Sequence, residues 1–288
     1  MTRDRLPVTR VCCAVYLVGL VAASVAQAQT LRDFEYSRPL RGERELKAHV
    51  EFAAGRLVVG PGSANQLYQM RLQYDADRFR PLGSYEATGG QVRLGVESNG
   101  QGGIHIGRRE ALAQTATLQF AKSVPLALDL SLGAAEGELE LGGYRISELN
   151  LKSGASRLEV SFGSPNPGQC RSAAVSTGAG EVIISDAGNS GCSRWEVSSG
   201  VGAVTVGLGG AWPADAVLHL SVAMGGVTMQ APRGLGVRVT MNGFLADFSG
   251  RDFSKNGKVY TSAGYERAAR KVDVQVNSAL GGVKVEWK

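Results

Sequence analysis

The residues of this sequence that could carry chemistry are two central cysteines, three histidines and one cluster of charged side chains. Cys170 and Cys192 begin two similar stretches, CRSAAVSTGAGEVII and CSRWEVSSGVGAVTV, so they could form either a structural disulfide or a redox pair. Redox pairs usually have Cys-x-x-Cys spacing, which is missing here. The prediction is therefore a structural disulfide between Cys170 and Cys192.

The histidines, His49, His105 and His219, could bind a metal ion only if the fold brought them together. They are far apart in the sequence, and none belongs to an H-x-H or HExxH motif. The sequence also contains no G-x-S-x-G nucleophile motif and no GxxxxGK[ST] phosphate loop. We therefore predict no catalytic residues, no metal ligands, no cofactor-binding residues and no cofactor.

The best local cluster of ionisable side chains consists of Asp247, Arg251, Asp252 and Lys255. Acid–base catalysis needs such groups close together, and polysaccharide lyases and hydrolases use long β-helices. A carbohydrate-active lyase or hydrolase on a β-helical scaffold is therefore the alternative function. Because the cluster lies in an expected loop, where charged residues are common, the main prediction is that the protein is not an enzyme.

The elements that must position these residues are β-strands repeated at a fixed interval. A shift of 22 positions carries Cys170 to Cys192 and Gly180 to Gly202. Each repeat has an alternating strand, a glycine turn and a second alternating strand, and one repeat alone cannot bury its apolar face. Stacked repeats can bury it, so the sequence predicts an all-β, β-solenoid or β-helix-like stack of short two-strand rungs with Gly-rich turns.

Strand alternation also predicts which side chains face the interior of this stack. The expected interior residues are Val175, Val182, Ile184, Val197, Val204 and Val206, and the expected outward residues are Glu181, Glu196 and Thr205. Four aromatic residues are expected to pack in the core or at rung edges, with exposed ligand contacts as the alternative: Tyr144, Trp195, Trp212 and Tyr260. Rungs about 4.8 Å apart would also place Cys170 and Cys192 within reach of a disulfide.

Residues 1–28 have the pattern of a secretory signal peptide. Three arginines precede an apolar run from Val11 to Ala26, and Ala26-Gln27-Ala28 has the A-x-A form of a cleavage site. The run is shorter than the ~18 residues of a spanning helix, so we predict no stable transmembrane segment after cleavage. The predicted location is periplasmic, extracellular or at the cell surface, where oxidising conditions preserve disulfides.

Removal of the signal peptide leaves a weakly basic chain in two predicted regions. It takes away three arginines and one aspartate, so the formal net charge falls from +5 to +3, which does not suggest a nucleic-acid partner. Residues 29–125 form an N-terminal β-rich region, and residues 126–288 form the solenoid. Glu110–Phe120 is expected to include one short helix, and Asn256-Gly257 is expected to form a hairpin turn.

Several motifs resemble a known bacterial family. The run LALDLSLGAAEGELELGGYRISELNLKSGASRLEVSFGSPN, the glycine repeats after it and the closing SALGGVKVEW are similar to toast-rack proteins. The segments ELKAHVEFAAGRLVVGPG and YDADRFRPLGSYE resemble the toast-rack N-terminal region. That family is similar in turn to the "putative adhesin" proteins and to the C-terminal domain of LiaF-type cell-wall stress-response proteins. The resemblance implies a β-solenoid-like envelope protein of unassigned molecular function.

The function predicted from shape and resemblance is that of a non-catalytic, exported cell-envelope protein, either adhesin-like or an interaction scaffold of unknown ligand. A solenoid presents long rows of outward side chains, which suit an extended partner such as an envelope protein or a glycan. Uncovered strands in the end rungs could also join copies of the chain, so self-association through the end rungs is a further prediction.

Overall fold

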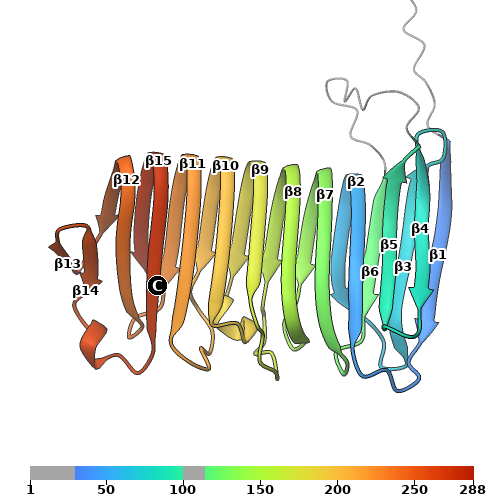
Figure 1. Cartoon of the computed structure of the whole chain (residues 1–288), viewed down its shortest axis with the longest axis horizontal. Coiled ribbons are helices and arrows are strands. Elements are labelled where there is room, and N and C mark those ends of the chain that lie inside the picture. The colour runs from blue at the N-terminus through green and yellow to red at the C-terminus, as the bar shows by residue number, and fades with distance from the viewer. Residues whose placement is uncertain (1–29, 100–113) are drawn as a thin grey trace, which may run out of the picture.

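A computed structural model describes residues 30–99 and 114–288 as an elongated stack of β-strands (Figure 1). The predicted signal peptide and His105 lie outside the described residues. The described strands are β1 (Leu31–Pro39), β2 (Leu46–Pro61), β3 (Gln66–Asp75), β4 (Phe79–Glu86), β5 (Gln91–Ser98), β6 (Thr115–Phe120), β7 (Pro125–Glu140), β8 (Arg145–Ser161), β9 (Ala173–Ser185), β10 (Arg194–Gly207), β11 (Ala216–Ala231), β12 (Gly236–Gly250), β13 (Phe253–Asn256), β14 (Val259–Ser262) and β15 (Lys271–Trp287). Two short 3-10 helices, η1 (Ala187–Ser190) and η2 (Tyr265–Arg267), are the helices of this part of the chain. None of its helices has the length and apolar character that crossing a membrane requires.

The repeating unit of the fold is a long strand bent near its middle. Each long strand from β7 to β11 runs up one face of the stack, bends at the top in Figure 1 and returns along the other face. In β9 the bend includes Gly180, whose φ is +132°. The two short strands predicted for each rung are therefore halves of one bent strand, 13 residues long in β9 and 17 in β8.

Neighbouring rungs pair in parallel along the stack. Val197 of β10 lies opposite Val175 of β9, and Gly202 lies opposite Gly180. The 22-position shift in the sequence is therefore the register in which these two strands pair. This pairing confirms the predicted all-β solenoid of stacked rungs.

The core lies between the two faces of the stack and consists mainly of aliphatic side chains. All six residues predicted to face the interior are at most 1% exposed: Val175, Val182, Ile184, Val197, Val204 and Val206. Glu196 is exposed, and Glu181 and Thr205 are half-buried, as expected for outward positions. Burial of one aliphatic side chain contributes roughly 1.5–3 kcal/mol, so a row repeated in every rung stabilises the whole stack.

The order of rungs at the C-terminal end differs from their order in the sequence. The strands follow one another as β11, β15, β12, β14 and β13, so the last strand of the chain is inserted between β11 and β12. Figure 1 shows β15 in red between the two orange strands. The sequence repeats alone do not predict this insertion.

The N-terminal strands continue the same hydrogen-bonded sheet. β2 pairs in parallel with β7, so the sheet crosses the predicted division between residues 125 and 126, and this division stays a prediction. The helix predicted within Glu110–Phe120 is wrong for Thr115–Phe120, which form β6, and residues 110–113 lie outside the described part. This segment forms a strand because every second side chain is apolar and buried: Ala116, Leu118 and Phe120 all point into the core.

Open strand edges occur at both ends of the stack. At one end, β1 pairs only with β3 among the described strands. At the other end, β14 pairs with only three residues of β12, Arg238–Thr240, so most of that edge of β12 has no partner among the described strands. Unpaired edges of this kind can accept another strand. Self-association through the end rungs stays a prediction.

The C-terminal end carries the predicted hairpin and a compact ionic cluster. β13 and β14 pair across Asn256-Gly257, which confirms the predicted hairpin turn. Beside it, Arg238 donates two hydrogen bonds to the carboxylate of Asp273, at 2.9 and 3.0 Å, and the Tyr265 hydroxyl donates a third at 2.7 Å. This cluster links β12, β15 and η2.

Acid should weaken this cluster through Asp273. Burial alone would raise the pKa of Asp273, but the hydrogen bonds from Arg238 and Tyr265 outweigh burial and hold its pKa below the usual value. A carboxyl group with a lower pKa in the folded state stabilises the fold above its unfolded pKa of about 3.9, and this contribution is lost as the pH falls through the folded pKa.

We therefore expect Asp273→Asn to lower the free energy of unfolding by about 1 kcal/mol at pH 7, because solvent screens a pair whose side chains are 40% exposed. The difference from the unmodified protein should shrink below about pH 4. Urea unfolding of both proteins at pH 7 and pH 3 tests this expectation. An equal difference at both pH values would contradict it.

Candidate ligand-binding surface

A groove of about 800 Å³ crosses five neighbouring rungs, β9, β10, β11, β15 and β12, next to the bend. Its volume lies within the range of about 300–1,000 Å³ that ligand sites usually have. The lining residues are Ser176, Thr177, Ser198, Ser199, Gly200, Ser221, Val222, Ala223, Asn242, Gly243, Lys258, Asn277, Ser278 and Ala279. Small and polar residues therefore form nearly all of its surface.

One row of hydroxyl and amide side chains runs along the groove. Its members occupy the same register position in successive rungs: Ser176, Ser198, Ser221, Asn277 and Asn242. All five are exposed or half-buried, and within residues 30–99 and 114–288 none has a side-chain hydrogen-bond partner. Strand spacing repeats these groups about every 4.8 Å. The row can donate and accept hydrogen bonds along an extended ligand.

The groove contains almost no ionisable groups. Lys258, at its C-terminal end, is the one charged side chain among the described lining residues. General acid–base catalysis needs positioned titratable groups at the reacting atoms. The polar groups that this surface offers to a ligand are therefore mainly hydroxyl and amide side chains.

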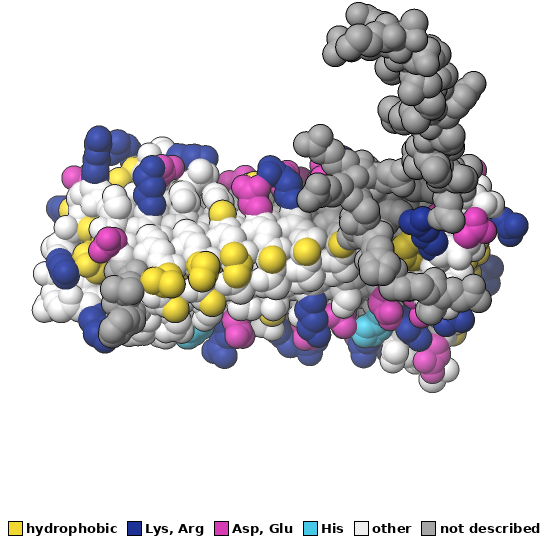
Figure 2. Space-filling view, turned by 90° about the horizontal axis from the view of Figure 1, so that it is seen from above, with side chains coloured by type: hydrophobic (Ala, Val, Ile, Leu, Met, Phe, Trp, Pro, Cys, Tyr) yellow, Lys and Arg dark blue, Asp and Glu magenta, His cyan; other side chains and the backbone are white. Residues whose placement is uncertain are grey.

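A row of exposed apolar side chains follows the bend beside the groove. Val201, Met224 and Leu280 share one register position and are 52%, 52% and 43% exposed. Alanines, Ala179 and Ala155, hold this position in β9 and β8. Figure 2, which looks down on the bend, shows a row of yellow side chains running lengthwise across the middle of the molecule. Contiguous exposed apolar side chains often mark interaction sites.

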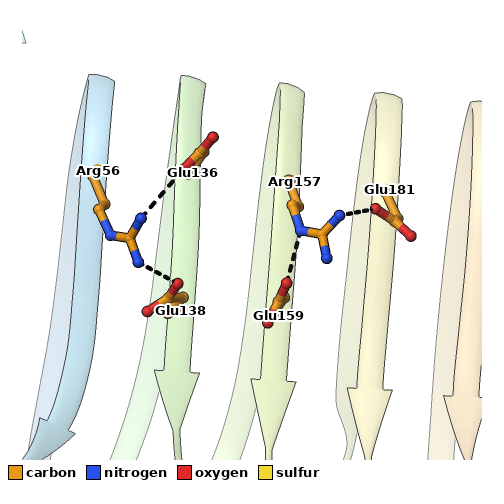
Figure 3. Close-up of polar contacts among 6 residues, drawn as sticks. All are labelled: Arg56, Glu136, Glu138, Arg157, Glu159 and Glu181. Atoms are coloured by element: carbon orange, nitrogen blue, oxygen red, sulfur yellow. Dashed lines mark hydrogen bonds and ion pairs between the residues drawn. The ribbon is translucent and has the colours of Figure 1, made fainter. Parts of the chain in front are cut away.

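Four glutamates on the second halves of β7, β8 and β9 are paired with arginines. Figure 3 shows the two groups: Arg56 with Glu136 and Glu138, and Arg157 with Glu159 and Glu181. The hydrogen bond to Glu159 and the charge of Glu181 raise the pKa of Arg157 above its usual value. These glutamates are charge-paired links between side chains of the same or neighbouring rungs.

The histidines do not form a site in the described part of the chain. His49 lies on β2, where its Nδ1 is 3.3 Å from Oδ2 of Asp129. His219 lies on β11, five rungs further along the stack. Among residues 30–99 and 114–288, no group of three or more His, Cys, Asp or Glu side chains could hold a metal ion.

The charged residues between positions 247 and 255 lie on β12, on β13 and in the turn between these strands. Asp247, Arg251, Asp252 and Lys255 are all exposed, and no ion pair joins any two of them among the described residues. The Lys255 ammonium instead lies 5.4 Å from the ring centroid of Tyr260.

The cysteines are joined as the sequence predicts. A disulfide connects Cys170 to Cys192 with a Cα–Cα distance of 4.5 Å, across two neighbouring coils. Both residues are buried, and their backbones form an isolated parallel bridge. The bond therefore fixes the turns that precede β9 and β10.

The aromatic residues mostly belong to the core. Tyr144, Trp195 and Trp212 are at most 6% exposed, so the alternative of exposed ligand contacts is wrong for them. Trp195 packs edge-on against Phe162, with ring centroids 6.0 Å apart. Tyr260 is half-buried at the C-terminal end of the stack.

Sequence reasoning missed the polar row in the groove. The signal was present, because the 22-position shift that relates the cysteines also relates Ser176 to Ser198. Outward positions of any strand are usually polar, so two serines alone did not distinguish a binding row from ordinary surface.

Comparison with known proteins gives one family match. Residues 26–185 match the family described as the N-terminal domain of toast_rack, DUF2154. This match covers more than half of the chain and extends to the end of β9. No curated protein matches the sequence significantly. Similarity of the C-terminal part to LiaF-type proteins stays a prediction.

Two solved structures match this chain over most of its length at low sequence identity. A "putative cell adhesion protein" from Clostridium sporogenes ATCC 15579 is 14% identical, with a TM-score of 0.49 over 89% of this chain and 100% of that chain. A "putative adhesin" from Bacteroides fragilis NCTC 9343 is 10% identical, with a TM-score of 0.36 over 90% of this chain and 98% of that chain.

Proposed function

The chain belongs to the toast-rack family, and on that premise we propose that it is an exported, non-catalytic protein of the cell envelope that binds an extended partner. The observation that carries the proposal is the groove with its row of hydroxyl and amide side chains across five rungs. The partner is an envelope glycan or an extended segment of an envelope protein.

The geometry of the groove supports an extended partner over a compact one. Its polar groups repeat along the stack axis, so a polymer with regularly spaced hydroxyl or amide groups can make the same contact at each rung. The adjoining row of Val201, Met224 and Leu280 offers apolar surface to the same partner. Many weak, repeated contacts of this kind suit an adhesin-like role or an interaction scaffold.

Two features support export. The N-terminal sequence has the pattern of a signal peptide, and a disulfide such as Cys170–Cys192 persists in oxidising compartments outside the cytosol. The groove offers hydrogen bonds and almost no titratable groups, which supports a role in binding without catalysis.

Co-sedimentation of the oxidised mature protein with envelope fractions tests the proposal. We expect saturable binding to one of three fractions, namely peptidoglycan sacculi, outer-membrane vesicles or intact cells. The double variant Ser198→Arg, Ser221→Arg should weaken this binding at least tenfold, because two long charged side chains would fill the groove. Each tenfold loss corresponds to about 1.4 kcal/mol of binding free energy.

The matched control places the same side chains on the other face. Thr205 and Thr228 are outward-facing partners in β10 and β11, on the second halves of these strands. The double variant Thr205→Arg, Thr228→Arg should therefore bind like the unmodified protein. Equal loss in both double variants, or no binding to any fraction, would contradict a ligand site in the groove.

A further inference from the structure

The positive charge of the chain is concentrated at one end of the stack. Residues 232–271 contain eight Lys or Arg and three Asp or Glu, a net charge of +5 that equals the formal net charge of the whole chain. They include β12, β13, β14 and η2. Figure 2 shows several of the Lys and Arg side chains at this end, on the left of the view.

Most of these cations have no acidic partner. Arg238 pairs with Asp273, and Lys271 pairs with Glu266. The other six are exposed and form no ion pair within the described residues: Arg233, Arg251, Lys255, Lys258, Arg267 and Arg270. A surface with this excess of uncompensated cations attracts anionic ligands.

Two of the unpaired arginines line one cavity. The cavity measures about 340 Å³, which suits a small ligand, and its lining includes Arg233, Arg267, Asp252 and Trp287. Trp287 is held in place by Phe253, whose ring stacks 5.6 Å away, and by its indole N–H, which donates to the carbonyl of Arg251 at 2.9 Å. The lining of the cavity thus includes two arginines, one aspartate and an aromatic ring that is held in place.

These groups select a particular ligand chemistry. Guanidinium groups bind phosphate and carboxylate oxygens through paired hydrogen bonds. The carboxylate of Asp252 would repel a bare anion, but it can accept hydrogen bonds from hydroxyl groups. The indole of Trp287 adds apolar surface against which the C–H face of a sugar ring can pack. A small ring that carries one oxyanion and several hydroxyl groups can form all of these interactions at once.

We propose that this cavity binds an anionic sugar unit, with its phosphate or carboxylate at Arg233 and Arg267 and its hydroxyls at Asp252. The site lies at the end of the stack and is built from residues other than those of the groove. It therefore does not depend on the function proposed above.

Calorimetric titration of the oxidised mature protein with four probes tests the proposal. Glucose 6-phosphate and glucuronate carry the two oxyanions on the same ring, glucose lacks the anion, and inorganic phosphate lacks the ring. At least one anionic sugar should bind ten or more times more tightly than both glucose and inorganic phosphate, and the tighter of the two identifies the preferred oxyanion. Equal affinity for inorganic phosphate, or no binding of either anionic sugar, would overturn the proposal.

Three variants distinguish ligand binding in the cavity from attraction to the general positive charge of this end of the stack. Arg233→Gln, Arg267→Gln should lose at least tenfold in affinity for the preferred sugar. Gly264→Trp should also abolish binding, because Gly264 lines the cavity and a Cβ there meets no atom within 4 Å, so the added ring fills the cavity at unchanged charge. Arg251→Gln, Lys255→Gln removes two charges from the same end outside the lining. A loss in this control equal to that of the arginine pair would overturn the proposal.

Discussion

Replacing Gly225 with alanine should unfold the stack, whereas the same change at Gly226 should be tolerated. Gly225 has a φ of +143°, and a Cβ at this position would overlap the carbonyl oxygen of Gly202 in the neighbouring rung. That oxygen belongs to the backbone of a paired strand, so it cannot rotate away as a side chain would. We expect Gly225→Ala to cost more than about 4 kcal/mol of the free energy of unfolding.

Gly226 is the matched control because it is the next residue in the same rung. Its φ lies outside the left-handed region, and the nearest atom to an added Cβ is the carbonyl oxygen of Gly282, at 3.9 Å. Gly226→Ala should therefore change the free energy of unfolding by less than about 1 kcal/mol. Urea unfolding of the two variants measures the contrast, and similar stabilities would show that the bend tolerates side chains.

The same close approach explains why the rung register could be predicted from the sequence. Gly180, Gly202, Gly225 and Gly281 form a column in which an added Cβ on each would meet the backbone of the preceding rung in the stack. Only glycine fits these four positions, so β9, β10, β11 and β15 each keep one at the same place, whereas β8 has Ser156 there. Alternation of apolar residues around this glycine then fixes which side chains enter the core.

The order of the rungs could not be predicted in the same way, because alternation and bend glycines determine the shape of a rung and not its neighbours. The chain builds β12, the β13–β14 hairpin and η2 before β15 returns to pair with β11. A clue is nevertheless present, since Met224-Gly225-Gly226 and Leu280-Gly281-Gly282 have the same pattern, and Met224 pairs with Leu280. At the bend, β11 therefore resembles its spatial neighbour β15 more than it resembles β12, the strand that follows it in the sequence.

The candidate surfaces were less accessible to prediction than the core. Ser198 and Ser221 share a row only because their strands pair with a 23-position offset, one residue longer than the offset between Ser176 and Ser198. The cavity at the end of the stack depends on Arg233, Arg267 and Trp287, which belong to three separate segments of the chain. Such a combination depends on the insertion of β15, which the repeats do not reveal.

Removal of the disulfide should be the second large effect on stability. The bond joins residues separated by 22 positions, and closing a loop of this size stabilises the folded state by about 3 kcal/mol, chiefly by restricting the unfolded chain. We therefore expect the double variant Cys170→Ala, Cys192→Ala to lose about 3 kcal/mol in urea unfolding. Alanine is the suitable replacement, because both positions are buried and a serine hydroxyl there would add a separate cost.

Unfolding with and without dithiothreitol separates the crosslink from the packing of the two side chains. The reductant should destabilise the unmodified protein by nearly the full amount and leave the double variant unchanged, since the variant has no bond to break. If reduced and oxidised protein unfold at the same urea concentration, the bond contributes no stability. The stability of the protein should therefore depend on its cellular compartment. A chain held in a reducing compartment would lack this crosslink and the stabilisation that it provides.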